Sequence, residues 1–454
     1  MERSRTAANV VVYPEDSLPP FRTVVLGLQH VLAMFGATVL APIVMGLDPS
    51  LAIFFSGIGT LMFIAITGGR VPSYLGSSFA FIAPVLAAKA SGGVPAALGG
   101  IIAAGVVYGI IGLIVMFTGV GWVEYLMPPI VTAAVVGVIG LALAPVALNM
   151  AATDVRLAAL SFTVAALVAV AARGFPRLIP ILIGAVVAYV VAALAGQVDF
   201  STVRSAAWVG LPSFQAPVFS WTAISLIAPV ALVLVAENTG HIKALSSNME
   251  RDLMPYLGRG FLGDALATIV SGFGGGTGQT TYAENIGVMA MTRVYSIYVF
   301  GAAGVTAIVL GFCPKFGALI GSIPVPVMGG LSILLFGLIA ATAGKIIRDA
   351  RIDLTQPRPL IVLGSTLVIG VGSAALSNAH SAVATALQGR SVPASVPTGE
   401  LHIWNFALGD MALATFAAIL VNLVLVAVER RQHRATEEPG LEGVADGAAT
   451  EVRA

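Results

Sequence analysis

Two short segments about 200 residues apart, Ser77-Ser78-Phe79-Ala80 and Thr280-Thr281-Tyr282-Ala283, share one order of residue types: two hydroxyl residues, an aromatic residue and an alanine. Each lies in a glycine-rich break within an apolar part of the chain, and Glu284 follows the second segment directly. Repeated polar breaks at corresponding places in the two halves of a membrane chain are typical of the binding site of a transporter. These two segments therefore predict where a ligand binds.

The composition predicts a membrane protein. Hydrophobic residues make up 57% of the 454 residues and charged residues only 10%, whereas a soluble protein carries about 25% charged residues. Apolar stretches of about 17–25 residues recur along the chain, and each is long enough to cross about 30 Å of hydrocarbon. Because backbone groups find no water there, these stretches must be helical unless they line an enclosed cavity. The predicted fold class is an all-α polytopic membrane protein.

Apolar runs and their flanking Pro, Gly and charged residues predict about fourteen transmembrane segments. Their approximate ranges are 22–45, 51–68, 79–90, 95–118, 128–148, 157–172, 178–196, 222–244, 260–273, 283–291, 295–313, 325–343, 358–377 and 404–428. The third and tenth are too short to span as continuous helices. We expect short extended strands to break these two segments.

The basic residues predict the orientation of the chain. With fourteen segments and a cytoplasmic N-terminus, eighteen of the 23 Lys and Arg residues fall on the inner side. The five on the outer side are Lys89, Arg156, Arg204, Lys315 and Arg390. This is the bias of the positive-inside rule, so both termini are expected in the cytoplasm. The acidic, Gly- and Ala-rich end of the chain predicts a disordered tail.

Matched pairs of features suggest an internal repeat. His30 precedes Phe79 by 49 residues, Glu237 precedes Tyr282 by 45, and proline-rich starts open the fifth and twelfth segments. Two halves of seven segments would run in opposite senses across the membrane, because seven is odd, which makes the repeat inverted. The alternative is that Gly, Pro and Ala recur by chance. An inverted repeat brings the two breaks face to face near the midplane, where backbone donors, aromatic faces and carboxylates suit a flat, uncharged, hydrogen-bonding ring.

Two glutamates within predicted segments are candidate functional residues, because an ionisable group inside the membrane is costly. Glu237 lies four residues before His241, so the two side chains share a helical face and are expected to be within reach of each other. A carboxylate beside an imidazole can exchange a proton near neutral pH. The alternative is a polar pair that only holds helices together. Glu284 begins a half-helix, where the alternative role is to stabilise the helix N-terminus.

Other polar residues within or near segments have weaker interpretations. Gln29 and His30 could support the site or make only structural hydrogen bonds. Asp264, Lys243 and Arg293 fall near the predicted inner ends of segments, where snorkelling or loop anchoring is expected rather than contact with a substrate.

Four motifs stand out, at residues 28–38 (LQHVLAMFGAT), 74–84 (YLGSSFAFIAP), 236–241 (AENTGH) and 280–290 (TTYAENIGVMA). They resemble the nucleobase–ascorbate transporter family, and within it the branch of bacterial uracil and pyrimidine permeases. The resemblance runs from about Pro19 to Val428. It implies fourteen helices in two inverted seven-segment repeats, with segments 1–4 and 8–11 forming a core domain and segments 5–7 and 12–14 a gate domain.

The resemblance also implies domain boundaries. They are a cytoplasmic N-terminal tail at 1–20, core parts at 21–118 and 218–318, gate parts at 119–217 and 319–430, and a disordered cytoplasmic tail at 431–454. A homodimer through the gate domain is expected from the family alone.

The resemblance also implies which residues of this chain are functional. The implied substrate-binding residues are Glu237, Glu284, Phe79, Ala283, Tyr282 and Ala37. The implied proton-coupling residues are Glu237, His241 and Glu284. The two glutamates would accept hydrogen bonds from the ring, Phe79 and Ala283 would offer backbone groups, and the other two substrate-binding residues would line the pocket.

Two positions bear on the substrate. Ala283 stands where uracil carriers of the family have glycine, and its methyl group could narrow the pocket. Glu284 stands where purine carriers of the family often have glutamine, which favours a pyrimidine.

The predicted function is a proton-coupled symporter that imports a neutral nucleobase, uracil or thymine, across the bacterial cytoplasmic (inner) membrane. No metal or other cofactor is expected besides the coupling proton, and the expected partners are the nucleobase and membrane lipid, not nucleic acid. The alternatives are a xanthine or purine permease and, more remotely, an anion carrier of the same fold, which two carboxylates would disfavour by repulsion. An intramembrane enzyme is not expected, because the chain has no His-Glu-x-x-His or Gly-x-Ser-x-Gly motif.

Overall fold

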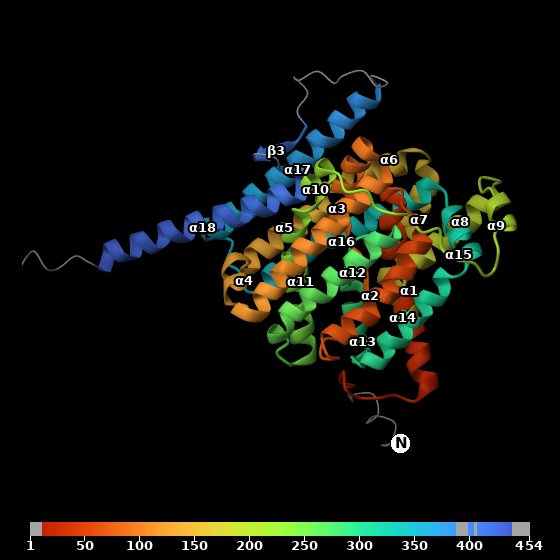
Figure 1. Cartoon of the computed structure of the whole chain (residues 1–454), viewed down its shortest axis with the longest axis horizontal. Coiled ribbons are helices and arrows are strands. Elements are labelled where there is room, and N and C mark those ends of the chain that lie inside the picture. Colours follow the sequence, from red (N-terminus) through yellow and green to blue (C-terminus); the bar gives the residue numbers. More distant parts are fainter. Residues whose placement is uncertain (1–10, 387–397, 404–405, 438–454) are drawn as a thin grey trace, which may run out of the picture.

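The computed structural model describes residues 11–386, 398–403 and 406–437, most of which lie in helices (Figure 1). The elements of the first half are α1 (Pro20–Met45), α2 (Pro49–Ile66), β1 (Leu75–Ser77), the 3₁₀ turn η1 (Phe79–Phe81), α3 (Ile82–Thr118), α4 (Gly121–Leu126), α5 (Pro129–Ala142), α6 (Ala144–Ala152), α7 (Val155–Ala171), η2 (Phe175–Leu178), α8 (Pro180–Leu194) and α9 (Ser201–Ser205).

The second half also places a short strand between helices. Its elements are α10 (Trp221–Ile227), α11 (Val230–Met249), η3 (Met254–Tyr256), α12 (Leu257–Gly274), β2 (Gln279–Thr281), α13 (Ala283–Thr292), α14 (Ile297–Gly311), α15 (Pro314–Gly321), α16 (Val325–Asp349), α17 (Pro357–Ala386), β3 (Glu400–Ile403), β4 (Phe406–Gly409) and α18 (Asp410–Glu437). In Figure 1 the helices of the two halves are interleaved, and α18 projects from one side of the bundle.

The strands expected to break the third and tenth segments are confirmed. β1 precedes η1 and α3, and β2 precedes α13, which has only ten residues. The two strands pair antiparallel, with Leu75 opposite Thr281, Gly76 opposite Thr280 and Ser77 opposite Gln279. The backbone N–H and C=O groups of these non-helical residues therefore bond to each other across the strand pair, as the interior of a membrane requires.

Local chemistry explains where several helices begin. Asp48 caps α2 by accepting from the Ser50 N–H at 2.8 Å, and Asp154 caps α7 by accepting from the Arg156 N–H at 3.0 Å. Proline occupies the first turn of α1, α5, α8 and α16, where its missing N–H costs no hydrogen bond. Between the expected third and fourth segments the chain kinks inside α3 at Gly93, whose φ of 72° favours glycine.

Contacts between helices form two sets. In the first, which we call the core group, α12 packs on α2 and α3, α14 packs on α1 and α2, and α10 packs on α3. In the second, the gate group, α16 packs on α5, α6 and α7, α17 packs on α5 and α18, and α8 packs on α7. Helix α11 contacts both groups, and α13 contacts α1 and α11. The division of the chain into core and gate domains, with its boundaries, stays a prediction.

Small residues allow the helices of the core group to approach closely. A Cβ atom at Gly112 of α3 would lie 2.9 Å from the Leu262 backbone N of α12, and one at Gly258 would lie 2.8 Å from the Met116 backbone N. Lipid chains are as apolar as leucine, so membrane helices associate through such close packing. The pair α3–α12 is therefore a rigid support for the strand pair beside it.

The number of membrane crossings stays a prediction. Among the described residues, eight helices are long and apolar enough to cross a membrane, or nine if α14 and α15, bent by 82°, form one span. Two further apolar helices, α7 and α8, are shorter. The helical content and these apolar spans establish a polytopic helical membrane protein, while the count of fourteen and the inverted relation of the halves are not tested by them.

Several details differ from the sequence prediction. The expected eighth segment is present as one apolar span, Trp221–Met249, but its helix is interrupted near Pro229, which cannot donate a backbone hydrogen bond, and so forms α10 and α11. The fourteenth segment was expected from residue 404, but strands β3 and β4 pair as a hairpin and α18 begins at Asp410. Helices α4 and α9 were not predicted. The tail expected to be disordered from residue 431 is helical through Glu437, and the rest of it, like Arg390, lies outside the described residues.

Candidate functional site

The paired strands hold a cavity between the core and gate groups. Its volume is about 60 Å³, and on the same scale a single water molecule needs about 10–15 Å³. Its lining residues are Ser77, Phe79, Val136, Ile139, Glu237, His241, Thr281, Tyr282, Ala283, Glu284, Ile339 and Thr342. Six of the seven residues named from the sequence lie on this cavity, although they come from positions as far apart as 79 and 284.

Glu237 lies on α11 and reaches toward β1. Ser78 donates its hydroxyl to Glu237 Oε2 at 3.1 Å, and the same hydroxyl accepts from the Ala80 N–H at 3.3 Å. Ser78 thus caps η1 and orients the carboxylate at once. The remaining acceptor positions of the carboxylate are available to a ligand in the cavity, since a carboxylate offers about four.

Glu284 lies in the first turn of α13 and also lines the cavity. The first N–H groups of a helix have no partner within the helix, and those of α13 begin at Ala283. A carboxylate is favoured at this end of the helix dipole. The strand–helix junction therefore presents backbone donors and a carboxylate acceptor side by side.

His241 does not bond to Glu237, which corrects the expected direct pair. Both side chains line the cavity, as their spacing on α11 predicted, but no hydrogen bond or ion pair between them is found in this part of the described chain. His241 Nδ1 instead lies 2.9 Å from the Thr281 hydroxyl on β2. The strand offers the closer partner, so the imidazole is oriented by β2.

Tyr282 joins three elements through its hydroxyl group. It donates to the Ser77 carbonyl at 3.0 Å and accepts from the Thr38 hydroxyl at 3.1 Å, while its ring lines the cavity. A Cβ atom at Gly76 would lie 2.6 Å from this ring, so only glycine fits opposite Thr280 in the strand pair. The ring is therefore held in place by hydrogen bonds and by packing.

Of the remaining candidate residues, Phe79 and Ala283 line the cavity and Ala37 does not. Phe79 begins η1, lines the cavity and packs its ring edge-on against Phe336 of α16, with 5.5 Å between the ring centroids. Ala283 lines the cavity as expected. Ala37 of α1 is buried, but it is not among the residues that line this cavity. Its neighbour Thr38 reaches the site through Tyr282.

The gate group supplies residues that the sequence did not reveal. Val136 and Ile139 of α5 and Ile339 and Thr342 of α16 form the other wall of the cavity. They lie in ordinary apolar helices, so neither spacing nor charge marks them. Only the position of α5 and α16 across the cavity from the strand pair identifies them.

Asp264 is a second correction. It was expected to anchor a loop, but it is fully buried on α12 and accepts a hydrogen bond from Asn238 Nδ2. Asn238 Oδ1 in turn accepts from the Thr281 hydroxyl at 3.3 Å, and Thr281 contacts His241. Asp264 Oδ1 has no hydrogen-bond partner within the described structure. A hydrogen-bonded chain therefore connects the cavity with a buried carboxylate.

His30 has a structural position. The Asn285 amide nitrogen lies 3.0 Å from His30 Nδ1 and 3.2 Å from its carbonyl oxygen, and the His30 ring packs 4.6 Å from that of Phe300. These contacts tie α1 to α13 and α14. His30 does not line the cavity, so of the two interpretations left open, structural hydrogen bonding fits.

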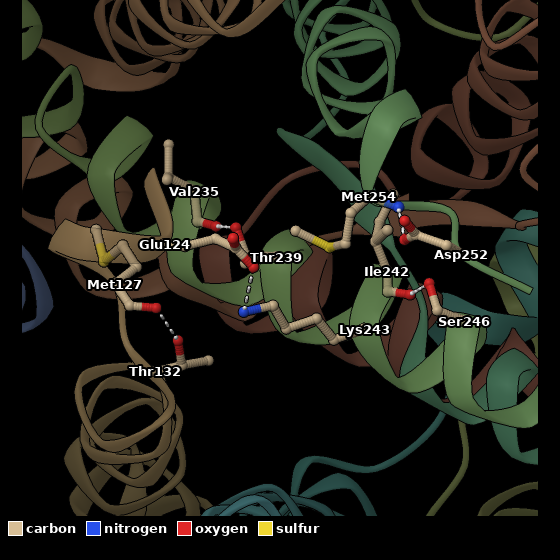
Figure 2. A network of polar contacts seen from close by, with 10 residues as sticks. All are labelled: Glu124, Met127, Thr132, Val235, Thr239, Ile242, Lys243, Ser246, Asp252 and Met254. Carbon is tan, nitrogen blue, oxygen red and sulfur yellow. Dashed lines mark hydrogen bonds and ion pairs between the residues drawn. The ribbon is translucent and has the colours of Figure 1, made fainter. Parts of the chain in front are cut away.

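Lys243 and Arg293 lie away from the cavity. Lys243, two residues after His241 on α11, forms an ion pair of 3.2 Å with Glu124 of α4 (Figure 2). Arg293 is exposed at the end of α13, where its carbonyl accepts from the Val12 N–H at 2.9 Å. Both positions agree with anchoring.

Comparison with known proteins identifies the family. The family model described as "Permease family" (Xan_ur_permease) matches residues 21–379. The chain is 49% identical to RutG of Escherichia coli (strain K12), over 93% of this chain and 94% of that protein. It is 45% identical to the uracil permease of Bacillus caldolyticus, over 88% of this chain and 91% of that protein. It is 43% identical to the uracil permease of E. coli K12, over 78% of this chain and 86% of that protein.

Two solved structures are similar in fold. The transmembrane domain of a cyanobacterium bicarbonate transporter, BicA, has a TM-score of 0.56 at 14% identity and covers 72% of this chain and 93% of its own. The murine Solute Carrier 26 family member A9 anion transporter has a TM-score of 0.59 at 11% identity, and the match covers 91% of this chain and 69% of that one. These similarities concern the fold alone.

The match to the family extends over most of the chain, and the motifs that carry the sequence resemblance surround the cavity. The relatives are permeases, so the chain is a multi-pass membrane transporter and not an enzyme. The chain belongs to the xanthine and uracil permease family, the nucleobase–ascorbate transporters.

Proposed function

We propose that this permease imports uracil or thymine into the bacterial cytoplasm by proton symport across the inner membrane, with both termini on the cytoplasmic side. The observation that carries the proposal is the presence of two carboxylates, Glu237 and Glu284, in one small cavity beside two aromatic residues, Phe79 and Tyr282. The relatives named uracil permease support the pyrimidine class.

The chemistry of the cavity matches a neutral pyrimidine. Uracil offers two ring N–H donors and two carbonyl acceptors in one plane. The carboxylates of Glu237 and Glu284 would accept from ring N–H groups, and the backbone N–H groups at the start of η1 and α13 would donate to ring carbonyls. Aromatic side chains supply apolar contact to the faces of the ring.

Alternating access would come from movement of the core group against the gate group. The cavity lies between them, with α11, α13 and the strand pair on one side and α5 and α16 on the other. A displacement of one group relative to the other would open the cavity toward either side of the membrane in turn, as in other carriers with repeated halves.

Proton coupling is assigned to Glu237, Glu284 and His241. All three line the cavity, and His241 is linked through Thr281 and Asn238 to the buried Asp264. Protonation of this cluster would change the charge that faces the substrate, so proton and pyrimidine binding would be thermodynamically linked.

The test is uptake of radiolabelled uracil in a permease-deficient bacterial host. Wild type is compared with Glu237→Gln, Glu284→Gln and the exposed control Glu250→Gln, each with and without a protonophore. Saturable uptake in wild type and the control, lost with protonophore and in both site variants, supports the proposal. Wild-type protein at the membrane without uracil uptake would contradict the pyrimidine assignment.

Two alternatives are distinguished in the same cells. Saturable uptake of radiolabelled xanthine that unlabelled uracil does not inhibit would indicate a purine permease of the family. Uptake of sulfate would indicate an anion carrier, which the similar fold of the bicarbonate and Solute Carrier 26 structures makes worth measuring. Two carboxylates in the cavity disfavour an anion by repulsion.

A further inference from the structure

A second and larger cavity lies between α1, α8, α14 and α15, away from the polar site. Its volume is about 420 Å³, and none of its exposed lining area is polar. The lining residues are Leu28, Val31, Leu32, Phe35, Leu182, Ala185, Val186, Tyr189, Leu310, Phe316, Leu319, Ile320 and Ile323. A smaller apolar pocket shares Phe35, Leu182, Ala185 and Ile323 and continues toward Met328 and Leu331 of α16.

We propose that this cavity binds one acyl chain of a phospholipid whose phosphate lies near Lys315. Water is not a suitable occupant, since a bound water needs two to four polar partners and the walls offer none. The polar, planar nucleobase is excluded for the same reason. An apolar chain is the occupant whose chemistry matches the walls.

The mouth of the cavity opens onto the membrane-facing surface. Leu28, Val186 and Leu319 are 44%, 52% and 40% exposed at its rim. Hydrocarbon surrounds such a surface in a bilayer. An unfilled cavity would forfeit the dispersion contacts of every wall residue, so a neighbouring acyl chain gains contacts by entering it.

One end of the cavity carries groups suited to a lipid headgroup. Phe316 lines the cavity, and the preceding Lys315 places its Nζ 5.1 Å from the centre of the Trp208 ring. No ion pair of Lys315 is found among the described residues. A lysine beside a tryptophan suits the phosphate level of the membrane interface. The hydroxyl groups of Tyr189 and Ser322, 2.7 Å apart, bond to each other and leave the wall apolar.

The walls of the cavity belong to both helix groups. Helices α1, α14 and α15 contact α2, whereas α8 contacts α7 and α16. An acyl chain between them would fill a seam that the proposed movement of core against gate must deform. We therefore expect the occupant to affect the uptake rate, and this consequence alone rests on the proposed function.

The test of binding does not depend on uptake. Native mass spectrometry of the purified transporter counts retained phospholipid in wild type, in Ala185→Trp, which fills the cavity, and in the control Leu194→Trp, on the lipid-facing surface of α8 and 85% exposed. Wild type and the control are expected to retain one phospholipid, and Ala185→Trp to lose it by about tenfold. Equal retention in all three would overturn the proposal.

A second measurement covers the case in which Ala185→Trp does not fold. Wild-type protein is reconstituted with a phospholipid that carries a photoreactive group within its acyl chain. Crosslinks concentrated within residues 182–189 and 316–323 support the site, whereas crosslinks spread evenly along the lipid-facing surface of α8 would refute it. Lys315→Gln should lower lipid retention while leaving the acyl-chain crosslinks at the same residues. If uracil uptake fails in wild type, the proposed function falls and the lipid result stands.

Discussion

Asp264 is the residue whose position was least expected. Its side chain is fully buried, one carboxylate oxygen accepts from Asn238, and the other has no partner among the described residues. Burying a carboxylate without full hydrogen bonding costs free energy, and an asparagine of the same shape would avoid that cost. The carboxylate is therefore expected to serve transport and not folding.

Asp264→Asn tests this role. The substitution keeps the shape and a hydrogen bond to Asn238, so the melting temperature should not fall, while uracil uptake should drop by about tenfold or more, equivalent to about 1.4 kcal/mol. Asp252→Asn is the matched control, because Asp252 is exposed and accepts a hydrogen bond from the Met254 N–H at 2.9 Å. Unchanged uptake in Asp264→Asn, or a lower melting temperature with proportional loss of protein, would contradict a transport role.

The strand pair is the element on which the site depends. Each strand has only three residues, yet the pair positions Ser77, Thr281 and Tyr282 on one cavity. Its close packing is the reason for glycine at position 76, where a Cβ atom would lie 2.7 Å from the Tyr282 hydroxyl oxygen and 2.6 Å from the ring. Tyr282 is buried, so the ring has no free space into which to move.

Gly76→Ala should therefore impair both stability and transport. Displacing the ring would break its hydrogen bonds to Ser77 and Thr38, and overpacking of this kind costs about 1–3 kcal/mol. The expected result is a lower melting temperature and loss of most uracil uptake. The control Gly337→Ala lies on α16 with no atom within 4 Å of the added carbon, and it should be neutral or stabilising by about 0.5–1 kcal/mol. Normal uptake in Gly76→Ala would show that the strand pair tolerates a side chain there.

The N-terminal segment is an element that contacts the chain just after α11 and α13. Val12 pairs with Val294 as an isolated parallel bridge, and the Arg251 guanidinium lies 3.6 Å from the centre of the Tyr13 ring. Arg251 also donates to Glu15 Oε1 at 2.8 Å, which lowers the pKa of the Glu15 carboxyl group below its usual value. Both side chains of the ion pair are about half exposed, so its contribution to stability is small, about 0.2–1 kcal/mol.

The sign of the pH dependence follows from the lowered pKa. The stabilisation by Glu15 is present above the unfolded-state pKa of about 4.3 and is lost as the pH falls through the lower folded-state pKa. Wild type should melt at a slightly higher temperature than Glu15→Gln at about pH 6, and the difference should disappear as the pH is lowered through the folded-state pKa of Glu15. In an Arg251→Ala background the two should not differ at either pH. A difference that persists at low pH would contradict the assignment.

The orientation of the whole molecule rests on the distribution of basic residues. Arg204 on α9 is expected on the outer side and Arg348 at the end of α16 on the inner side, and both are exposed. In a Cys313→Ser background, Arg204→Cys should react with a membrane-impermeant maleimide in intact cells. Arg348→Cys should react only after the cells are permeabilised. The background protein without added cysteine is the control, and the reverse labelling pattern would invert the orientation.

Local chemistry explains how much of the fold was predictable. Apolar runs marked the helices, and the proline and glycine breaks marked most of their ends, because a membrane leaves the backbone few alternatives. The two extended strands were predicted from Ser77-Ser78 and Thr280-Thr281 because hydroxyl and β-branched residues interrupt the apolar pattern there. The β3–β4 hairpin and the short helices α4 and α9 were missed, since their sequences carry no comparable signal.

Charge in an apolar setting marked Glu237, Glu284 and His241 in advance, because polar groups within a membrane are rare enough to stand out in a single sequence. The tertiary structure alone decided their partners. It paired His241 with Thr281 instead of Glu237, buried Asp264, left Ala37 off the cavity, and completed the cavity with Val136, Ile139, Ile339 and Thr342. These contacts join residues 40 to more than 200 positions apart, and such distances are set by how helices pack, which no local pattern encodes.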